Sequence, residues 1–354
     1  MDRKYVSGSG FVWCLFLTIL NGLSAVASAQ RSDLTTGDAI PRDVREMYER
    51  GVSFLVDTQR DDGGWDDGQG GPGVSGMAVM CFLASGEDPN FGPYSGNIRR
   101  ALRSIIKQQD DTTGYFGGSM YHHGFAMLGL AEAYGTVDDR NLWTGTQDRK
   151  NRGLGPSLEL AVRAAVTSQK SNSFGAWRYS PSGNDADTSV AGAVLMGLLA
   201  ARNAGVEVPD EAIDRAVSYF VKMTAPSGQV AYSGGLGGFD ESMARISIGC
   251  LVYSIARRTD LPQFQQTLKY LTNKLEGGSS GHGGVEYQNY YQAQALFQGD
   301  IEAWKKWNKL LVRHLKSIQA ENGSFQGNYG THVSTALSLL ALAVNYRFLP
   351  IYER

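Results

Sequence analysis

The stretch TQRDDGGW, Thr58 to Trp65, follows a helical run, and the chain repeats variants of it. Gln169 precedes KSNSFGAW and Gln319 precedes AENGSFQ, so a glutamine, a glycine turn and a large aromatic recur together. We expect the glutamine to end a helix and its amide to satisfy free carbonyl groups there. The glycines permit a positive φ, and the aromatic ring can cover the turn. The stretch therefore predicts a structural corner and no catalytic role for Asp61 and Asp62.

The corner belongs to a unit that recurs six times along the sequence. Each unit reads as an amphipathic helix, a glycine-rich turn and a second, more apolar helix. One copy runs from NIRRALRSIIKQQ to GFAMLGLAEAYG, and the copy that begins EAIDRAVSYFVKM keeps this layout but lacks the glutamine. The steps from Gln59 to Gln319 average about 52 residues, near the longest period of repeat arrays. Glycine punctuates the units, with 44 copies in the chain.

The two helices of each unit differ in how much of their surface is apolar. The first has a polar stripe, as where Ile98, Leu102 and Ile105 share one side and basic residues the other. The second, as in TSVAGAVLMGLLA, is apolar or small nearly all round and must be covered on every side. We therefore expect an all-α fold of two concentric layers that closes into a ring, without polar terminal caps. The polar segment 136–157 is interpreted as a surface insertion.

The first residues read as an export signal, residues 1–29. Arg3 and Lys4 precede a short apolar core, and small residues up to Ala29 form a cleavage site. Cleavage would leave one toroid domain, 30–354, in a periplasmic or extracellular location. A retained anchor is the alternative, although the apolar run is shorter than the ~20 residues that a membrane helix needs. No integral membrane span is expected after the signal is removed.

Charge and cysteine content restrict the partners and the redox chemistry. The formal net charge of −2 is nearly balanced, so nucleic acid is not expected as a partner. Cys81 and Cys250 each lie within an apolar helical run. Buried free thiols are the expected state, and one long-range disulfide is the alternative.

The Gln-x-x-x-Gly-x-Trp pattern from Gln59 to Trp65, with degenerate copies at Gln109, Gln169 and Gln319, resembles a known repeat. It is similar to the repeat of squalene and hopene cyclases and of protein prenyltransferase β subunits. The resemblance covers nearly the whole mature chain. It implies an (α/α)6 toroid, in which six helical hairpins surround a central cavity.

The resemblance also indicates where catalytic groups would lie. Cyclases that start by protonation use an Asp-x-Asp-Asp-Thr motif, whose central Asp is the acid. The corresponding stretch here is NDADT, which places Ala186 at the central acid when Asp187 and Thr188 are matched to the end of the motif. A shift of one residue would bring Asp185 near the same space. The broken pattern argues against cyclisation by this acid.

Prenyltransferases of this kind hold zinc through an Asp-x-Cys and a later histidine. His332 in THVSTALSLLALA takes the place of that histidine, but Gln288 and Tyr290 stand where Asp and Cys are required. One ligand of three does not make a zinc site, so we expect neither a metal nor another cofactor. Of the adjacent His122 and His123, which point about 100° apart on a helix, one alone would face the cavity.

The starts of the inner helices should gather at one mouth of the cavity, where their partial positive charges also point. Many polar residues there are expected to be helix caps. The candidates for the cavity lining are His122, His123, Asp187, Thr188, Asp240, Glu241, Glu286, Tyr287, Tyr290, Tyr329 and His332.

Three hypotheses for function follow, in this order. The first is an exported protein that binds an apolar, isoprenoid-like small molecule or a peptide. The second is an enzyme of altered chemistry, a cyclase-like isomerase or a polysaccharide-acting toroid, with Asp185 or Asp187 and His123 or His332 as acid and base. The third is an interaction scaffold whose cavity is filled. The Tyr-rich stretch EYQNYYQAQ favours binding, since tyrosine offers a stacking face and a hydroxyl.

Overall fold

The computed structural model describes residues 40–65, 70–140, 142–143, 151–233, 240–275 and 284–352. The chain divides into two units, Met1–Pro41 and Arg42–Arg354, and every described helix belongs to the second. The predicted signal peptide, residues 1–29, lies outside the described residues.

The described residues form twelve α-helices and a short 3-10 turn, with no strand among them. The helices are α1 (Arg42–Asp57), α2 (Pro72–Leu83), α3 (Ser95–Lys107), α4 (Met120–Ala133), α5 (Leu154–Lys170), α6 (Thr188–Asn203), α7 (Asp210–Met223), α8 (Met243–Ile255), α9 (Pro262–Thr272), α10 (Val285–Gly299), α11 (Ile301–Ile318) and α12 (Thr331–Ala343), and η1 is Pro350–Tyr352.

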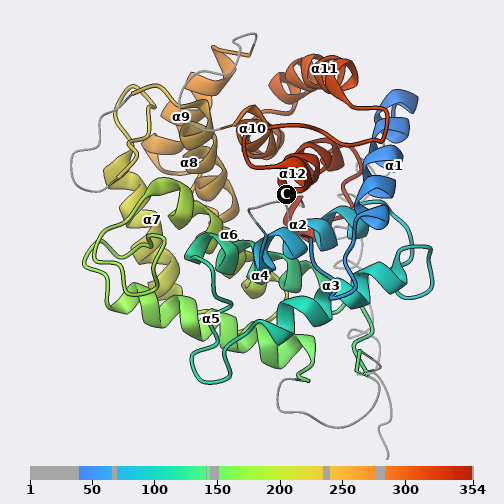
Figure 1. Ribbon diagram of the computed structural model, residues 1–354. Coiled ribbons are helices and arrows are strands. Elements are labelled where there is room, and N and C mark those ends of the chain that lie inside the picture. Colours follow the sequence, from blue (N-terminus) through green and yellow to red (C-terminus); the bar gives the residue numbers. More distant parts are fainter. Residues whose placement is uncertain are drawn as a thin grey trace, which may run out of the picture. The chain divides into compact units, whose positions relative to one another are not determined.

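The even-numbered helices form an inner ring, and the odd-numbered helices surround it (Figure 1). Around the ring α2 packs against α4, and α6, α8 and α10 follow in order. The last inner helix, α12, packs against both α10 and α2, so the ring closes. Each outer helix packs on an adjacent inner helix. The predicted all-α toroid of six hairpins in two layers is confirmed.

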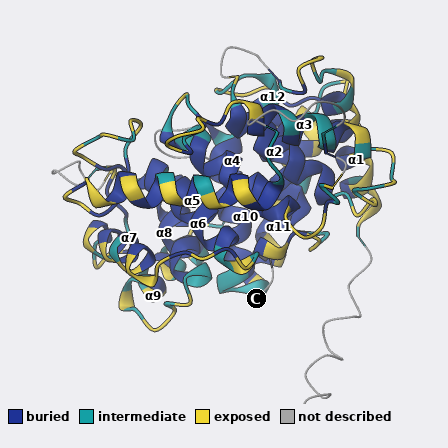
Figure 2. Ribbon diagram, turned by 90° about the horizontal axis from the view of Figure 1, so that it is seen from below, coloured by how far each residue is buried: buried dark blue, intermediate teal, exposed yellow. Residues whose placement is uncertain are grey.

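Burial separates the two layers, as the sequence pattern predicted. Every residue of α2 is buried, whereas α5 exposes one stripe to solvent (Figure 2). Small residues let the inner helices approach closely. A Cβ atom added to Gly129 of α4 would lie 2.6 Å from the backbone of Gly76 in α2. Side chains larger than hydrogen would therefore push these two helices apart.

Each corner glutamine joins two consecutive hairpins. Gln109 donates from Nε2 to the carbonyl of Gly114 in its own turn and to that of Ser157 in the next outer helix, both at 2.9 Å. Gln59, Gln169 and Gln319 make the same pair of bonds. The sequence had predicted that these amides satisfy carbonyls at the end of their own helix. The acceptors lie instead in the turn and in the neighbouring helix.

The tryptophans of the corners bond to the preceding outer helix. Trp65 donates from Nε1 to the carbonyl of Leu55, and Trp177 donates to that of Ala165, each at 2.9 Å. Both rings are buried, at 2% and 1% exposure. The tryptophan thus holds the corner to its own helix, while the glutamine holds it to the next one.

The described part of the segment 136–157 lies against the corner that contains Gln109. Leu142 is fully buried, and Trp143 donates from Nε1 to the carbonyl of Arg152 at 2.7 Å. Arg152 in turn donates to Oε1 of Gln109 at 3.1 Å. Helix α5 begins at Leu154, so the end of the predicted insertion is part of an outer helix.

The two cysteines of the described chain are buried free thiols. Cys81 lies in α2 and Cys250 in α8, two helices that are not neighbours in the inner ring. Burial raises the pKa of the Cys250 thiol to about 12. Within the described ranges, no helix combines the length and the apolar character needed to cross a membrane.

Candidate functional site

A cavity of about 910 Å³ lies where the inner helices begin. All six inner helices or the residues just before them contribute to its wall, as the sequence pattern predicted for the cavity mouth. The lining residues are Gly73, Val74, Met77, Gly118, Ser119, Tyr121, His122, Phe125, Tyr179, Ser189, Tyr232, Asp240, Ser242, Ala244, Arg245, Tyr287, Tyr329, Val333 and Leu337.

Apolar side chains supply one part of this wall. Met77 comes from α2, Phe125 from α4 and Leu337 from α12, three helices that pack side by side. Each is at most 5% exposed. This part of the wall can shield the hydrocarbon part of a ligand from water, but it has no side chain that could hydrogen-bond to a polar group.

Aromatic contacts span the ring between α4 and α10, which are three places apart in its six-helix order. Tyr121 of α4 donates a hydrogen bond from its hydroxyl to the hydroxyl of Tyr287 in α10. The rings of Phe125 and Tyr290 lie 6.0 Å apart between the same two helices. Burial is the main cause that raises the pKa of Tyr121 and Tyr287, so both phenols are neutral donors at ordinary pH.

The start of α6 holds a buried carboxylate. Asp187 caps the helix: Oδ1 accepts from the backbone N–H of Val190 at 2.8 Å, and Oδ2 lies 3.4 Å from Nε of Arg178. Its side chain is fully buried, and this burial raises its pKa. Asp185 is exposed and pairs with Nη1 of Arg178 at 3.0 Å. Thr188 is buried and donates to the carbonyl of Ala231 at 2.6 Å.

A second charged pair lies at the start of α8. Arg245, only 5% exposed, contacts Oδ1 of Asp240 through Nη2 at 2.9 Å and also donates to the Asp240 carbonyl at 3.0 Å. The guanidinium carbons of Arg178 and Arg245 lie 5.5 and 5.9 Å from the centroid of the Tyr232 ring. Glu241 is not part of this group, since it pairs with Lys274 at 2.6 Å.

The structure brings one of the two adjacent histidines to the cavity. His122 lines it and packs against the glycines of neighbouring turns, and burial lowers its pKa. His123 was also a candidate but lies between the two helix layers. There Nε2 is 3.0 Å from the carbonyl of Ala161 in α5, and Nδ1 faces the backbone N–H of Phe116 at 3.4 Å. Its side chain is fully buried, and burial lowers its pKa to about 4.

His332 does not line the cavity either. Its ring stacks on Phe54 of α1, with centroids 5.4 Å apart, between the inner and outer layers. Neither His123 nor His332 therefore faces the cavity, where an acid–base pair with Asp185 or Asp187 would have to act. No cluster of three or more His, Cys, Asp or Glu side chains able to hold a metal ion occurs among the described residues.

The remaining candidates come from α10 and the loop before α12. Glu286 is buried and accepts from the backbone N–H of Asn328 at 2.8 Å and from the Ser334 hydroxyl at 3.1 Å, so it holds the two inner helices together. Tyr329 lines the cavity beside Tyr287, with ring centroids 6.0 Å apart. Tyr290 is buried and does not line the cavity.

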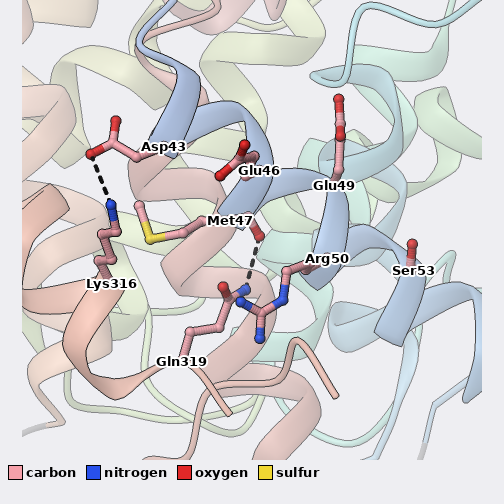
Figure 3. Close-up of a pocket in the computed structure, with 8 residues that line it drawn as sticks. All are labelled: Asp43, Glu46, Met47, Glu49, Arg50, Ser53, Lys316 and Gln319. Atoms are coloured by element: carbon pink, nitrogen blue, oxygen red, sulfur yellow. Dashed lines mark hydrogen bonds and ion pairs between the residues drawn. The ribbon is translucent and has the colours of Figure 1, made fainter. Parts of the chain in front are cut away.

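A second hollow, of about 450 Å³, lies on the outer layer between α1 and α11 (Figure 3). Lys316 of α11 approaches Asp43 of α1 at 3.9 Å, and Gln319 bonds to the Met47 carbonyl. These contacts belong to the joint where the ring closes, and we assign the hollow no ligand.

The lining residues that were not candidates include three tyrosines and an arginine: Tyr121, Tyr179, Tyr232 and Arg245. A signal for Arg245 was present, because it is the single charge within the otherwise apolar run SMARISIGC. Tyr179 and Tyr232 lie in loops, where helical periodicity does not indicate which way a side chain points.

Comparisons with known proteins support the fold. No family model matches the sequence, and a search of curated proteins gives no match. The type II terpene cyclase MstE from Scytonema, in complex with geranylgeranyl dihydroxybenzoate, is similar in structure with a TM-score of 0.55 and 16% identity, over 87% of this chain and 98% of that one. An α-amylase from Clostridium perfringens has a TM-score of 0.57 and 11% identity, over 86% of this chain and 98% of that one. At these identities the likeness concerns the fold alone: the chain has a terpenoid cyclase-like α/α toroid fold.

Proposed function

We propose that the protein binds an apolar, isoprenoid-like small molecule in its central cavity. The observation that carries this proposal is the cavity itself, about 910 Å³ in volume, which is lined by Met77, Phe125 and Leu337 together with several tyrosines. Sites for small molecules have this size and this mixture of apolar wall and few polar groups. The structural likeness to a cyclase that holds a geranylgeranyl substrate supports the same class of ligand.

The proposal includes export and a periplasmic or extracellular location, on the basis of residues 1–29. A peptide held at the mouth is the alternative ligand. Native mass spectrometry of the protein purified from its own host tests the proposal. We expect a co-purifying lipid of isoprenoid mass that is released on denaturation. A bound peptide would support the alternative, and an empty cavity would favour the scaffold.

A second candidate, an enzyme, rests on Asp187. Asp187 is not itself a lining residue, but Ser189, two residues further along the chain, is. Burial raises the pKa of the Asp187 carboxyl, and such a group retains a proton to higher pH, as a general acid must. The two histidines considered as its partners, His123 and His332, do not line the cavity, so the proposal is limited to this one group. Asp187→Asn keeps a helix cap, because Asn caps as well as Asp. If the protein converts geranylgeraniol to isomers detectable by gas chromatography, this variant should abolish conversion while Asp185→Asn retains it. The absence of products from the wild type would contradict this candidate.

A further inference from the structure

We propose that Arg245 selects a ligand with an oxyanion head group, a carboxylate or a phosphate, at the mouth of the cavity. This inference rests on the proposed function and names the chemical class of the amphiphile. The apolar side of the wall would hold the hydrocarbon chain. The polar side, where α8 begins, would hold the head group.

Arg245 has unused hydrogen-bonding capacity. Its two contacts with Asp240 both use Nη2, at 2.9 Å to Oδ1 and 3.0 Å to the backbone carbonyl. Nη1 is buried and has no hydrogen-bond acceptor among the described residues. A buried N–H without an acceptor is unfavourable, and guanidinium groups bind carboxylate and phosphate through two parallel bonds. An arriving oxyanion would supply the acceptor that Nη1 lacks.

The surroundings of Arg245 favour an anion at this point. Arg245 is the third residue of α8, so its side chain leaves the first turn, where the helix has its partial positive charge. Arg178, the other guanidinium beside Tyr232, already has two carboxylates, Asp185 at 3.0 Å and Asp187 at 3.4 Å. Arg245 is therefore the cation at the cavity with the smaller local negative charge.

Asp240 would compete with the anionic ligand for the guanidinium group of Arg245. Its side chain is 53% exposed, so its carboxylate can move into water when the guanidinium turns toward another anion. Removing the Asp240 charge should therefore strengthen the binding of an anionic ligand, whereas removing the Arg245 charge should weaken it.

The test compares three probes with the same hydrocarbon chain: geranylgeraniol, geranylgeranic acid and geranylgeranyl phosphate. Isothermal titration calorimetry gives their dissociation constants for the wild type, Arg245→Gln and Asp240→Asn. In the wild type at least one anionic probe should bind about tenfold more tightly than the alcohol. Arg245→Gln should remove this preference, so that the alcohol and the acids bind with similar affinity. Asp240→Asn should increase the preference.

Arg202→Gln is the matched control, since Arg202 pairs with Asp210 at 3.5 Å near the end of α6, about 20 Å from the start of that helix. It should retain the wild-type preference. Equal affinities for alcohol and acids in the wild type, or an unchanged preference in Arg245→Gln, would overturn the oxyanion site while the proposed cavity binding stands. If no probe binds, the proposed function fails as well. The stronger of the two anionic probes distinguishes a carboxylate from a phosphate ligand.

Discussion

Gln319 donates a hydrogen bond from Nε2 to the backbone carbonyl of Met47 at 2.8 Å, although the two residues are 272 positions apart in the chain. The same nitrogen bonds to the carbonyl of Gly323 at 2.9 Å. This is the pair of bonds that the internal corners make with their neighbours. The joint between the last and first hairpins is therefore chemically equivalent to the joints that Gln59, Gln109 and Gln169 make, which explains how the ring can close without capping repeats.

Two adjacent glutamines provide a test of the corner. Gln109 is buried and bonds to two carbonyls, whereas the neighbouring Gln108 is exposed and bonds only within its own helix, at the Ser104 carbonyl and hydroxyl. Gln109→Ala should lower the free energy of unfolding by about 2 to 4 kcal/mol, because it leaves both carbonyls without a donor. Gln108→Ala should change it by less than about 0.5 kcal/mol. Urea denaturation measures both, and equal losses would contradict the role of the corner glutamine.

The corner glycines allow a positive φ, and they also allow the turn to approach the neighbouring outer helix closely. Gly323 has a φ of 86°, and a Cβ atom added there would lie 2.2 Å from the carbonyl oxygen of Arg50 in α1. Gly205 has a φ of 89° but open space around it. Gly205→Ala should cost about 1 to 2 kcal/mol from the backbone alone. Gly323→Ala should cost about 1 to 3 kcal/mol more, because the helices must separate.

Thermal unfolding and denaturant midpoints of these two variants give the comparison. If both substitutions cost the same, the contact between the turn and α1 would not constrain the joint.

Stability should fall on acidification because of His123. Burial lowers the pKa of this residue from 6.5 to about 4 in the folded state. Between these values the unfolded chain binds more protons, so the contribution of His123 is complete above about pH 6.5 and is lost as the pH falls toward 4, by up to about 3 kcal/mol. His123→Gln should reduce the loss in unfolding free energy between pH 7 and 4.5 by about 2 to 3 kcal/mol relative to the wild type.

The exposed His314→Gln is the control for the loss of a histidine. Chemical denaturation at several pH values provides the measurement. Parallel pH curves for the wild type and His123→Gln would show that this histidine does not cause the acid sensitivity.

The fold could be predicted because each unit repeats the same pattern, one amphipathic helix followed by one that is apolar on every side. The sequence of α2 is apolar on every side, which indicated a helix that is buried all round. The amphipathic pattern of Ile98, Leu102 and Ile105 in α3 indicated an outer helix. The resemblance of the corner pattern to the repeats of cyclases and prenyltransferases then implied a closed toroid. The identity of its acceptors could not be predicted, since the carbonyl of Ser157 comes near Gln109 only when two hairpins pack together.

The candidate site was less accessible to sequence reasoning. Spacing alone indicated that one of His122 and His123 faces the cavity, but the choice depends on the rotation of α4 within the ring. His332 begins an inner helix, as expected, and yet stacks on Phe54 of the outer layer. Arg245 was missed because periodicity treats a charge in an apolar helix as an exception, and its neighbour Tyr232 was missed because it lies in a loop.

A matched pair of tryptophan substitutions tests most directly whether ligand enters the ring. Leu337 of α12 lines the cavity, and Leu310 of α11 is 37% exposed on the outer layer. Leu337→Trp should fill part of the cavity, and Val74→Phe provides a second filling variant on α2 if the first does not fold. We predict that filling weakens geranylgeraniol binding at least about tenfold, while Leu310→Trp changes it by less than about twofold. A folded Leu337→Trp or Val74→Phe protein that binds as tightly as Leu310→Trp would show that the ligand does not occupy the central cavity.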